Sequence, residues 1–210
     1  MNFSIFPSPI YAGKQIKCHY ENPVTLSTLS EQLCRYLTEL DPYGQKEIAV
    51  ICIGTDRSTG DCLGPLVGWY LKKYPINFSI YGTLDEPVHA TNMSEKLAAI
   101  QQNHHTPLII AVDACLGKLE SVGMINLGLG EIKPGAGVHK NLPPVGNIYF
   151  TGIVNVAGYM EFIVLQNTRL SIVMQMALLI ANSIVMGVKK AQRKRDDLKK
   201  RDTFLKNSLC

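Results

Sequence analysis

Two short, continuous apolar runs constrain the fold of this chain more than any other feature. They are EIAVICIG (residues 47–54) and PLIIAVDA (residues 107–114). Both have the length of a strand, and an uninterrupted apolar run is typical of a strand that is buried on both faces. We therefore predict a largely parallel sheet covered by helices, as in α/β proteins.

Segments with helical and strand patterns alternate around these two runs, which predicts one α/β domain over residues 1–210. A loop-rich lead-in over residues 1–25 precedes the alternation, and a basic helical tail over residues 189–210 ends it. Helices are expected over residues 25–40, 62–74, 93–103, 158–166 and 168–197, and further strands over residues 77–82, 121–128 and 147–157. The length of 210 residues and the 46% of apolar residues fit one globular domain.

The net charge of +4 is concentrated in the tail. Residues 189–201 hold eight lysines and arginines against two aspartates, a net charge of +6, which leaves about −2 for the other residues. Basic residues are favoured at the C-terminal end of a helix. We therefore interpret the tail as a solvated helix end and do not expect nucleic acid as a partner.

Cysteine usage and the apolar segments predict a cytoplasmic protein. The six cysteines are scattered without a CxxC pair or a zinc-ligand spacing, and the N-terminus lacks the pattern of a secretory signal. The one stretch long enough to span a membrane, residues 170–190, is interrupted by Ser171, Gln175, Asn182 and Ser183. We expect a buried core helix there, and no membrane association.

Three aspartates fall where an α/β sheet places its ligands, beyond the carboxyl ends of the strands. Asp56 and Asp61 lie in IGTDRSTGDCLGPLVG (residues 53–68), between the first strand and its helix, and Asp113 ends the second apolar run. Two carboxylates at close range cannot both ionise easily, so such a pair can share one proton and act as acid and base. With a histidine, the same pair could instead hold a divalent metal.

Both aspartates of such a pair also have a purely structural explanation. Asp61 could cap the helix that follows it, or precede a helix that begins at Pro65, and Asp113 could be a turn residue. The loops near the same sheet edge add Glu86 and His89, and His139 in the long segment over residues 129–146. A connection of that length is more often functional than filler, although loop histidines are often solvated.

Known nucleotide and serine-hydrolase motifs are absent from the sequence. The chain contains no GxxxxGK[ST], no GxGxxG and no GxSxG. These absences argue against nucleotide phosphate cradles and an elbow-type serine nucleophile, and they leave the carboxylate pair as the candidate chemistry.

Four segments together resemble the YyaC-type sporulation proteins, a family regarded as spore proteases. The segments are IGTDRSTGDCLGPLVG, GTLDEPVHATNM, LIIAVDACLG and KPGAGVHKNLPPVGNIYFTGIVNV, and the resemblance covers roughly residues 45–190. That family is more distantly similar to the germination protease, which degrades small acid-soluble spore proteins, and to hydrogenase maturation endopeptidases.

The resemblance implies a three-layer α/β/α sandwich with a mixed, largely parallel sheet of about five strands. It also implies that Asp61 and Asp113 occupy the two aspartate positions of the germination protease pattern. The maturation endopeptidases hold a nickel-recognition site at these positions with a histidine, and His89 and His139 lie in motifs particular to the YyaC-type group. The chain is shorter than a germination protease and lacks an evident propeptide.

The leading hypothesis is therefore a cytoplasmic, sporulation-associated peptidase in which Asp61 and Asp113 activate water without a cofactor. Asp56, Glu86, His89 and His139 would bind a peptide or protein substrate, such as small acid-soluble spore proteins. Two alternatives stay open: a non-catalytic peptidase-like protein that binds a partner through residues 129–146 and the basic tail, and a metal-dependent maturation endopeptidase. A homo-oligomer is compatible with each of these.

Overall fold

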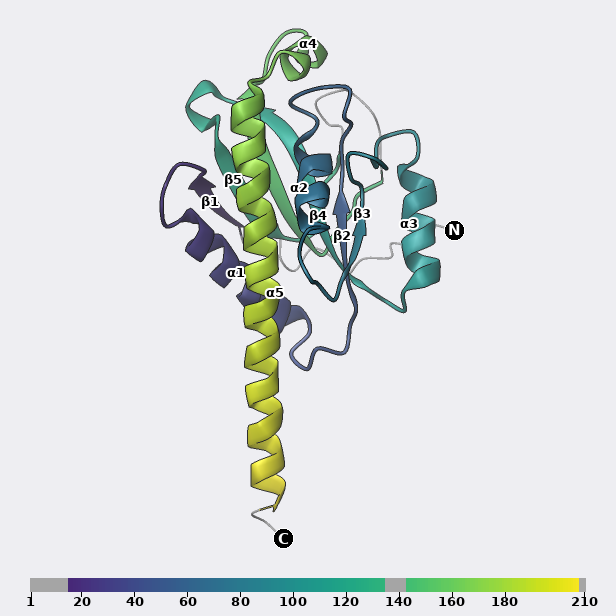
Figure 1. Cartoon of the computed structure of the whole chain (residues 1–210), viewed down its shortest axis with the longest axis vertical. Helices are drawn as coiled ribbons and strands as arrows, with labels where there is room; N and C mark the ends of the chain where they lie inside the picture. The colour runs from purple at the N-terminus through teal and green to yellow at the C-terminus, as the bar shows by residue number, and fades with distance from the viewer. Residues whose placement is uncertain (1–14, 135–142, 208–210) are drawn as a thin grey trace.

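A computed structural model describes residues 15–134 and 143–207 and contains one six-stranded sheet in the order β1-β5-β6-β4-β2-β3 (Figure 1). Strands β2, β3, β4 and β6 are parallel, and β5 runs antiparallel between β6 and β1. The strands are β1 (Gln15–His19), β2 (Ile48–Cys52), β3 (Ser79–Tyr81), β4 (Leu108–Gly117), β5 (Met124–Leu129) and β6 (Ile148–Val156). The mixed, largely parallel sheet confirms the predicted α/β architecture.

Helices cover both faces of the sheet and complete the three layers. The helices are α1 (Thr25–Leu40), α2 (Leu63–Leu71), α3 (Met93–Asn103), α4 (Glu161–Gln166) and α5 (Leu170–Asn207), with a 3₁₀ turn over Leu119–Ser121. Helices α1, α2 and α5 share one core with the even-numbered residues of β2 and β4, such as Val50 and Ile110. Helix α3 packs on the opposite face, where Ile51 and Ile109 belong to a second core.

Strand β1 corrects the predicted lead-in, because residues 15–19 form a sixth strand where the sequence predicts a loop. The strand is only five residues long and pairs antiparallel with β5, from Gln15 opposite Gly128 to His19 opposite Met124. Its apolar residues Ile16 and Cys18 are only half-buried. An edge strand of this kind lacks the long apolar run that identifies β2 and β4.

Strand β4 is longer than predicted and extends past the end of β2. Cys52, the last residue of β2, pairs with Val112, whereas β4 continues to Gly117 by pairing with β6. Asp113 therefore lies inside a strand and not at its end, which removes the interpretation of Asp113 as a turn residue. It lies one residue beyond the level at which β2 ends.

Helix α5 runs along one face of the sheet and projects beyond it at the C-terminal end (Figure 1). Its inner half packs on α1 and α2 and buries residues such as Val173, Met176, Ile180 and Ile184. It is long and apolar enough to cross a membrane, but half of its most apolar 18-residue window is buried inside the protein. These contacts are those of a core helix.

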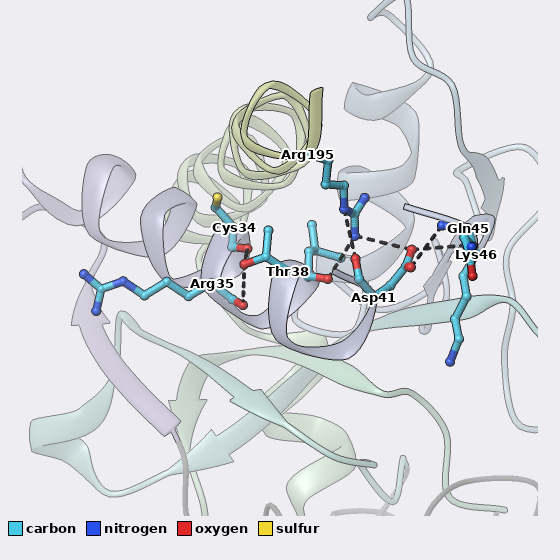
Figure 2. Close-up of polar contacts among 8 residues, drawn as sticks. Cys34, Arg35, Thr38, Asp41, Gln45, Lys46 and Arg195 are labelled. Atoms are coloured by element: carbon cyan, nitrogen blue, oxygen red, sulfur yellow. Dashed lines mark hydrogen bonds and ion pairs between the residues drawn. The ribbon is translucent and has the colours of Figure 1, made fainter. Parts of the chain in front are cut away.

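Arg195 anchors α5 to the end of α1 (Figure 2). Its guanidinium donates to the Leu37 carbonyl at 2.9 Å and to the Asp41 carbonyl at 3.0 Å, and it lies 3.4 Å from the Asp41 carboxylate. The Asp41 carboxylate in turn accepts the backbone N–H groups of Gln45 and Lys46. The Leu37 and Asp41 carbonyls also accept the backbone N–H groups of Asp41 and Gly44, so Arg195 adds a second donor to each carbonyl at the end of α1.

Candidate functional site

The loop between β2 and α2 is held by close contacts between backbone segments. A Cβ added to Gly54, whose φ is +142°, would lie 1.9 Å from the Asp61 carbonyl oxygen, and one added to Gly64 would lie 2.1 Å from the Ile53 carbonyl oxygen. The Thr55 N–H also donates to the Asp61 carbonyl at 3.2 Å. Only glycine fits at residues 54 and 64, and these contacts fix the backbone of Asp61 beside the end of β2.

The start of α2 argues against a simple capping role for Asp61. The helix begins at Leu63 with Cys62 as its N-cap, one residue after Asp61, and Gly64 and Pro65 lie inside its first turn. The arrangement with Gly64 as the cap and Pro65 as the first helical residue is therefore wrong. Asp61 is half-buried at the junction between loop and helix.

Asp113 lies on the face of the sheet that α3 covers, near the edge where the parallel strands end. Alternation along β4 places it on the same face as Ile109 and Ala111, which belong to the α3-side core. Its side chain is buried and accepts the Ala114 N–H at 2.9 Å. Burial raises the pKa of this carboxyl well above its ordinary value, the nearby Asp61 charge raises the pKa further, and the Ala114 N–H opposes both.

The charge of Asp61 therefore acts on the Asp113 carboxyl. The nearby Asp61 charge adds to the effect of burial in raising the pKa of the Asp113 carboxyl, while Asp61 retains partial access to solvent. Two carboxyl groups in unequal environments can divide the roles of acid and base between them. The pairing of β2 with β4 brings together residues that are 52 positions apart in the sequence.

Cys115 lies two residues after Asp113 on the same face of β4, and it is half-buried. Burial raises the pKa of its thiol to about 11; the Asp113 carboxyl also raises it, whereas a hydrogen bond with Thr151 and the Lys17 charge lower it. At neutral pH the group is a thiol and not a thiolate. A cysteine in that state is a poor nucleophile.

A row of polar residues extends from Asp113 across the neighbouring strands. Asp113 pairs with Thr151 on β6, Thr151 pairs with Asn126 on β5, and Asn126 pairs with Lys17 on β1. The Asn126 amide donates to the Thr151 hydroxyl at 2.9 Å. Sequence reasoning missed this row; its only signal is a single polar residue in each of two otherwise apolar strands, INLG and FTGIV.

The other predicted site residues lie in loops or outside the described residues. Asp56 is exposed in the loop that contains Asp61, and Glu86 is exposed in the loop after β3. His89 follows Val88, which bridges to Ile53, and its ring nitrogen Nδ1 lies 2.8 Å from the Thr91 hydroxyl. His139 lies outside the described residues.

Metal binding was an alternative for the same site. Across residues 15–134 and 143–207, the structure contains no group of three or more His, Cys, Asp or Glu side chains arranged to hold a metal ion. Asp61 and Asp113 could supply two carboxylate ligands, and a complete metal site would need others.

A separate open cavity of about 740 Å³ lies at the opposite edge of the sheet. It is bordered by α5 and by the segments that lead into β2 and β3. Five basic side chains line it together with two acidic ones, and its apolar lining includes Ile48, Phe78 and Val185. The basic side chains are Lys46, Lys189, Arg193, Arg195 and Lys199.

Comparison with known proteins gives three findings. A family model described as "Protein of unknown function (DUF1256)" matches residues 17–183. The chain is 57% identical over 140 residues to the "Uncharacterized protein YyaC" of Bacillus subtilis (strain 168). The aligned region covers 66% of this chain and 68% of that protein. Among solved structures, it is similar to a [NiFe] hydrogenase maturation protease, HycI, from Thermococcus kodakarensis KOD1, with a TM-score of 0.49, 16% identity, and coverage of 77% of this chain and 99% of that one.

Proposed function

The chain belongs to the DUF1256 family, a family of unknown function, and we propose that it is a peptidase in which Asp61 and Asp113 together activate water. The observation that carries this proposal is the buried Asp113 carboxyl, whose pKa is raised first by burial and then by the Asp61 charge. A carboxylic acid kept neutral beside a more exposed carboxylate supplies both of the groups that peptide hydrolysis requires.

In the proposed reaction, the Asp61 carboxylate accepts a proton from a water molecule, whose oxygen attacks the peptide carbonyl carbon. Asp113 donates its proton to the carbonyl oxygen, which gives a neutral tetrahedral intermediate. As the C–N bond breaks, Asp61 returns its proton to the leaving nitrogen and Asp113 recovers a proton from the intermediate. The products are a carboxylic acid and an amine, and both aspartates regain their starting states.

This proposal includes a peptide or protein substrate and a role in the cytoplasm of the sporulating cell. Both rest on the sequence motifs shared with the YyaC-type proteins and, through them, on the resemblance to the germination protease. Small acid-soluble spore proteins are the first substrates to test. Asp56, Glu86 and His89 are candidates for substrate contacts because the loops that carry them leave the same edge of the sheet.

The test is cleavage of small acid-soluble spore proteins by the purified chain, followed by mass spectrometry of the products. Asp61→Asn and Asp113→Asn should each abolish cleavage, and Asp85→Asn, which removes an exposed charge from the β3–α3 loop, should not. Loss of activity at high pH, when Asp113 ionises, is also expected. Full activity in both single variants would refute the paired mechanism.

A second candidate function is a non-catalytic protein that binds an anionic partner, and the basic cavity beside α5 favours it. In that case the protein has no turnover, and the Asp61→Asn/Asp113→Asn double variant keeps its binding. Retention on a heparin column tests the anionic surface: Lys189→Glu/Arg193→Glu should elute at lower salt, and the aspartate double variant should elute like the wild type. Metal analysis of the purified protein tests the maturation-endopeptidase alternative.

A further inference from the structure

The row of polar residues that runs from Asp113 through Thr151 and Asn126 to Lys17 contains a buried hydrogen-bond acceptor that accepts no described hydrogen bond. Within the described part of the chain, the Asn126 side-chain oxygen Oδ1 is fully buried and has no hydrogen-bond partner. Asn126 itself is only 9% exposed. A buried polar atom without a partner costs about 1–3 kcal/mol and is an exception in native structures that requires an explanation.

The hydrogen bonds around Thr151 indicate which end of the Asn126 amide is engaged. The Thr151 hydroxyl accepts from the Asn126 Nδ2 group at 2.9 Å and forms a second hydrogen bond with Cys115. A hydroxyl has one proton to donate. When Thr151 donates that proton to the sulfur, Asn126 must donate to Thr151, and its oxygen is left free to accept an N–H group.

Lys17 ends the same row on strand β1 and is exposed. Because directly paired residues lie on one face of a sheet, Lys17, Asn126, Thr151 and Asp113 share the face that carries the proposed reaction. Three strand spacings of about 4.8 Å separate Lys17 from Asp113, a span of roughly 14 Å. An extended peptide advances about 3.3 Å per residue, so this span corresponds to roughly four residues.

We propose that this row is the substrate-binding subsite of the peptidase and that it takes an acidic peptide segment. Asn126 Oδ1 accepts a backbone N–H of the substrate, and the Lys17 ammonium pairs with a carboxylate side chain roughly four residues from the cleaved bond, as the strand spacing sets. The inference rests on the proposed function and adds the substrate class. Because Oδ1 is buried, peptide binding at this subsite requires a local rearrangement that exposes it.

The competing explanation for Lys17 is protection of an edge strand. Lysines on edge strands discourage pairing with other chains, without any ligand. Edge-strand protection requires a charged side chain at residue 17, but it predicts no preference of the protein for acidic over basic peptides. It also predicts no effect of Asn126 on substrate binding. Peptide preference therefore separates the two explanations.

The first experiment measures cleavage-site preference with a peptide library derived from a whole proteome and mass spectrometry of the products. Wild-type cleavage sites should be enriched in Asp and Glu roughly four residues from the cleaved bond, and Lys17→Glu should replace this enrichment with Lys and Arg. Lys72→Glu, a charge reversal at an exposed lysine after α2, should leave it unchanged. Cleavage without acidic enrichment, or an unchanged preference in Lys17→Glu, would overturn the subsite.

The second experiment uses binding and does not depend on turnover. Fluorescent acidic and basic peptides of equal length are titrated against the Asp113→Asn chain. The acidic peptide should bind more tightly, with its affinity reduced about fivefold by Lys17→Glu, as one exposed ion pair allows. Equal affinity for both peptides would refute the inference even if cleavage occurs, whereas acidic preference without cleavage by the wild type would refute only the peptidase proposal.

Asn126 is tested by replacement with leucine, which removes the unpaired oxygen. In the cleavage assay we expect an increased KM with kcat unchanged, because the lost contact binds the substrate and does not take part in the reaction. Thermal unfolding of the same variant measures folding separately. An unchanged KM in a folded Asn126→Leu protein would show that the oxygen contacts no substrate.

Discussion

Replacing Asp113 with asparagine should change how the stability of the protein depends on pH. Burial and, to a smaller extent, the Asp61 charge raise the pKa of this carboxyl above its ordinary value of 3.8. The folded protein therefore binds the Asp113 proton more tightly than the unfolded chain does. This contribution to stability is fully present below about pH 4 and is lost as the pH rises toward the folded pKa.

The magnitude of the effect follows from one proton. Between the unfolded and folded pKa values, the free energy of unfolding falls by at most about 1.4 kcal/mol for each pH unit. Asparagine keeps a side-chain oxygen that can accept the Ala114 N–H, which Asp113 accepts at 2.9 Å, but it cannot ionise. The Asp113→Asn variant should therefore gain stability relative to the wild type as the pH rises from 4.

Urea unfolding of both proteins at half-unit intervals from pH 4 to pH 8 provides the measurement. The difference between their free energies of unfolding should widen across the lower part of this range and then level off above the folded pKa of Asp113. Asp85→Asn serves as the exposed control and should run parallel to the wild type. Parallel curves for Asp113→Asn and the wild type would refute the argument that this carboxyl is buried in its acid form.

Three further predictions concern stability and reactivity. Arg195→Met should lower the free energy of unfolding in urea by about 3 kcal/mol, since it removes the guanidinium that pairs with the buried Asp41 carboxylate and donates to two carbonyls at the end of α1; a loss below 0.5 kcal/mol would contradict this role. Gly64→Ala places a Cβ 2.1 Å from the Ile53 carbonyl oxygen, so it should lower the free energy of unfolding by about 1–3 kcal/mol and reduce cleavage activity. A variant as stable as the wild type would show that the loop can shift to accommodate the Cβ. Because the pKa of the Cys115 thiol is raised to about 11, Cys115 should react with iodoacetamide at pH 7.5 more slowly in the folded protein than in the unfolded chain. A faster reaction of Cys115 in the folded protein, measured by site-resolved mass spectrometry, would contradict the raised pKa.

The sequence was sufficient to predict the architecture because the central strands carry a strong, one-dimensional signal. The uninterrupted apolar runs predicted β2 and β4, and the alternating helices predicted a parallel sheet with two covered faces. Strand β1 escaped prediction because an exposed five-residue edge strand has few apolar positions. The end of β4 was misplaced because Asp113 interrupts the apolar run, whereas pairing with β6 continues the strand to Gly117.

The candidate site was predictable only in part for a related reason. Asp61 and Asp113 stand out because acids are rare at the ends of apolar strands, and the register of β2 and β4 brings them into electrostatic contact. Asn126 and Thr151 are common strand residues whose partnership depends on the pairing of β5 with β6. Register across an antiparallel pair is a tertiary property, and no local spacing in the sequence encodes it.

The contacts at Gly54 and Gly64 also affect how freely this loop can evolve. The Asp61 carbonyl lies against Gly54 and accepts the Thr55 N–H, and Gly64 lies against the backbone of Ile53. The exposed side chains of Asp56 and Arg57 take no part in these backbone contacts, so we expect that exchanging them leaves the backbone of Asp61 in place. The two glycines, and not the exposed side chains of the loop, thus set where the Asp61 backbone lies relative to the end of β2.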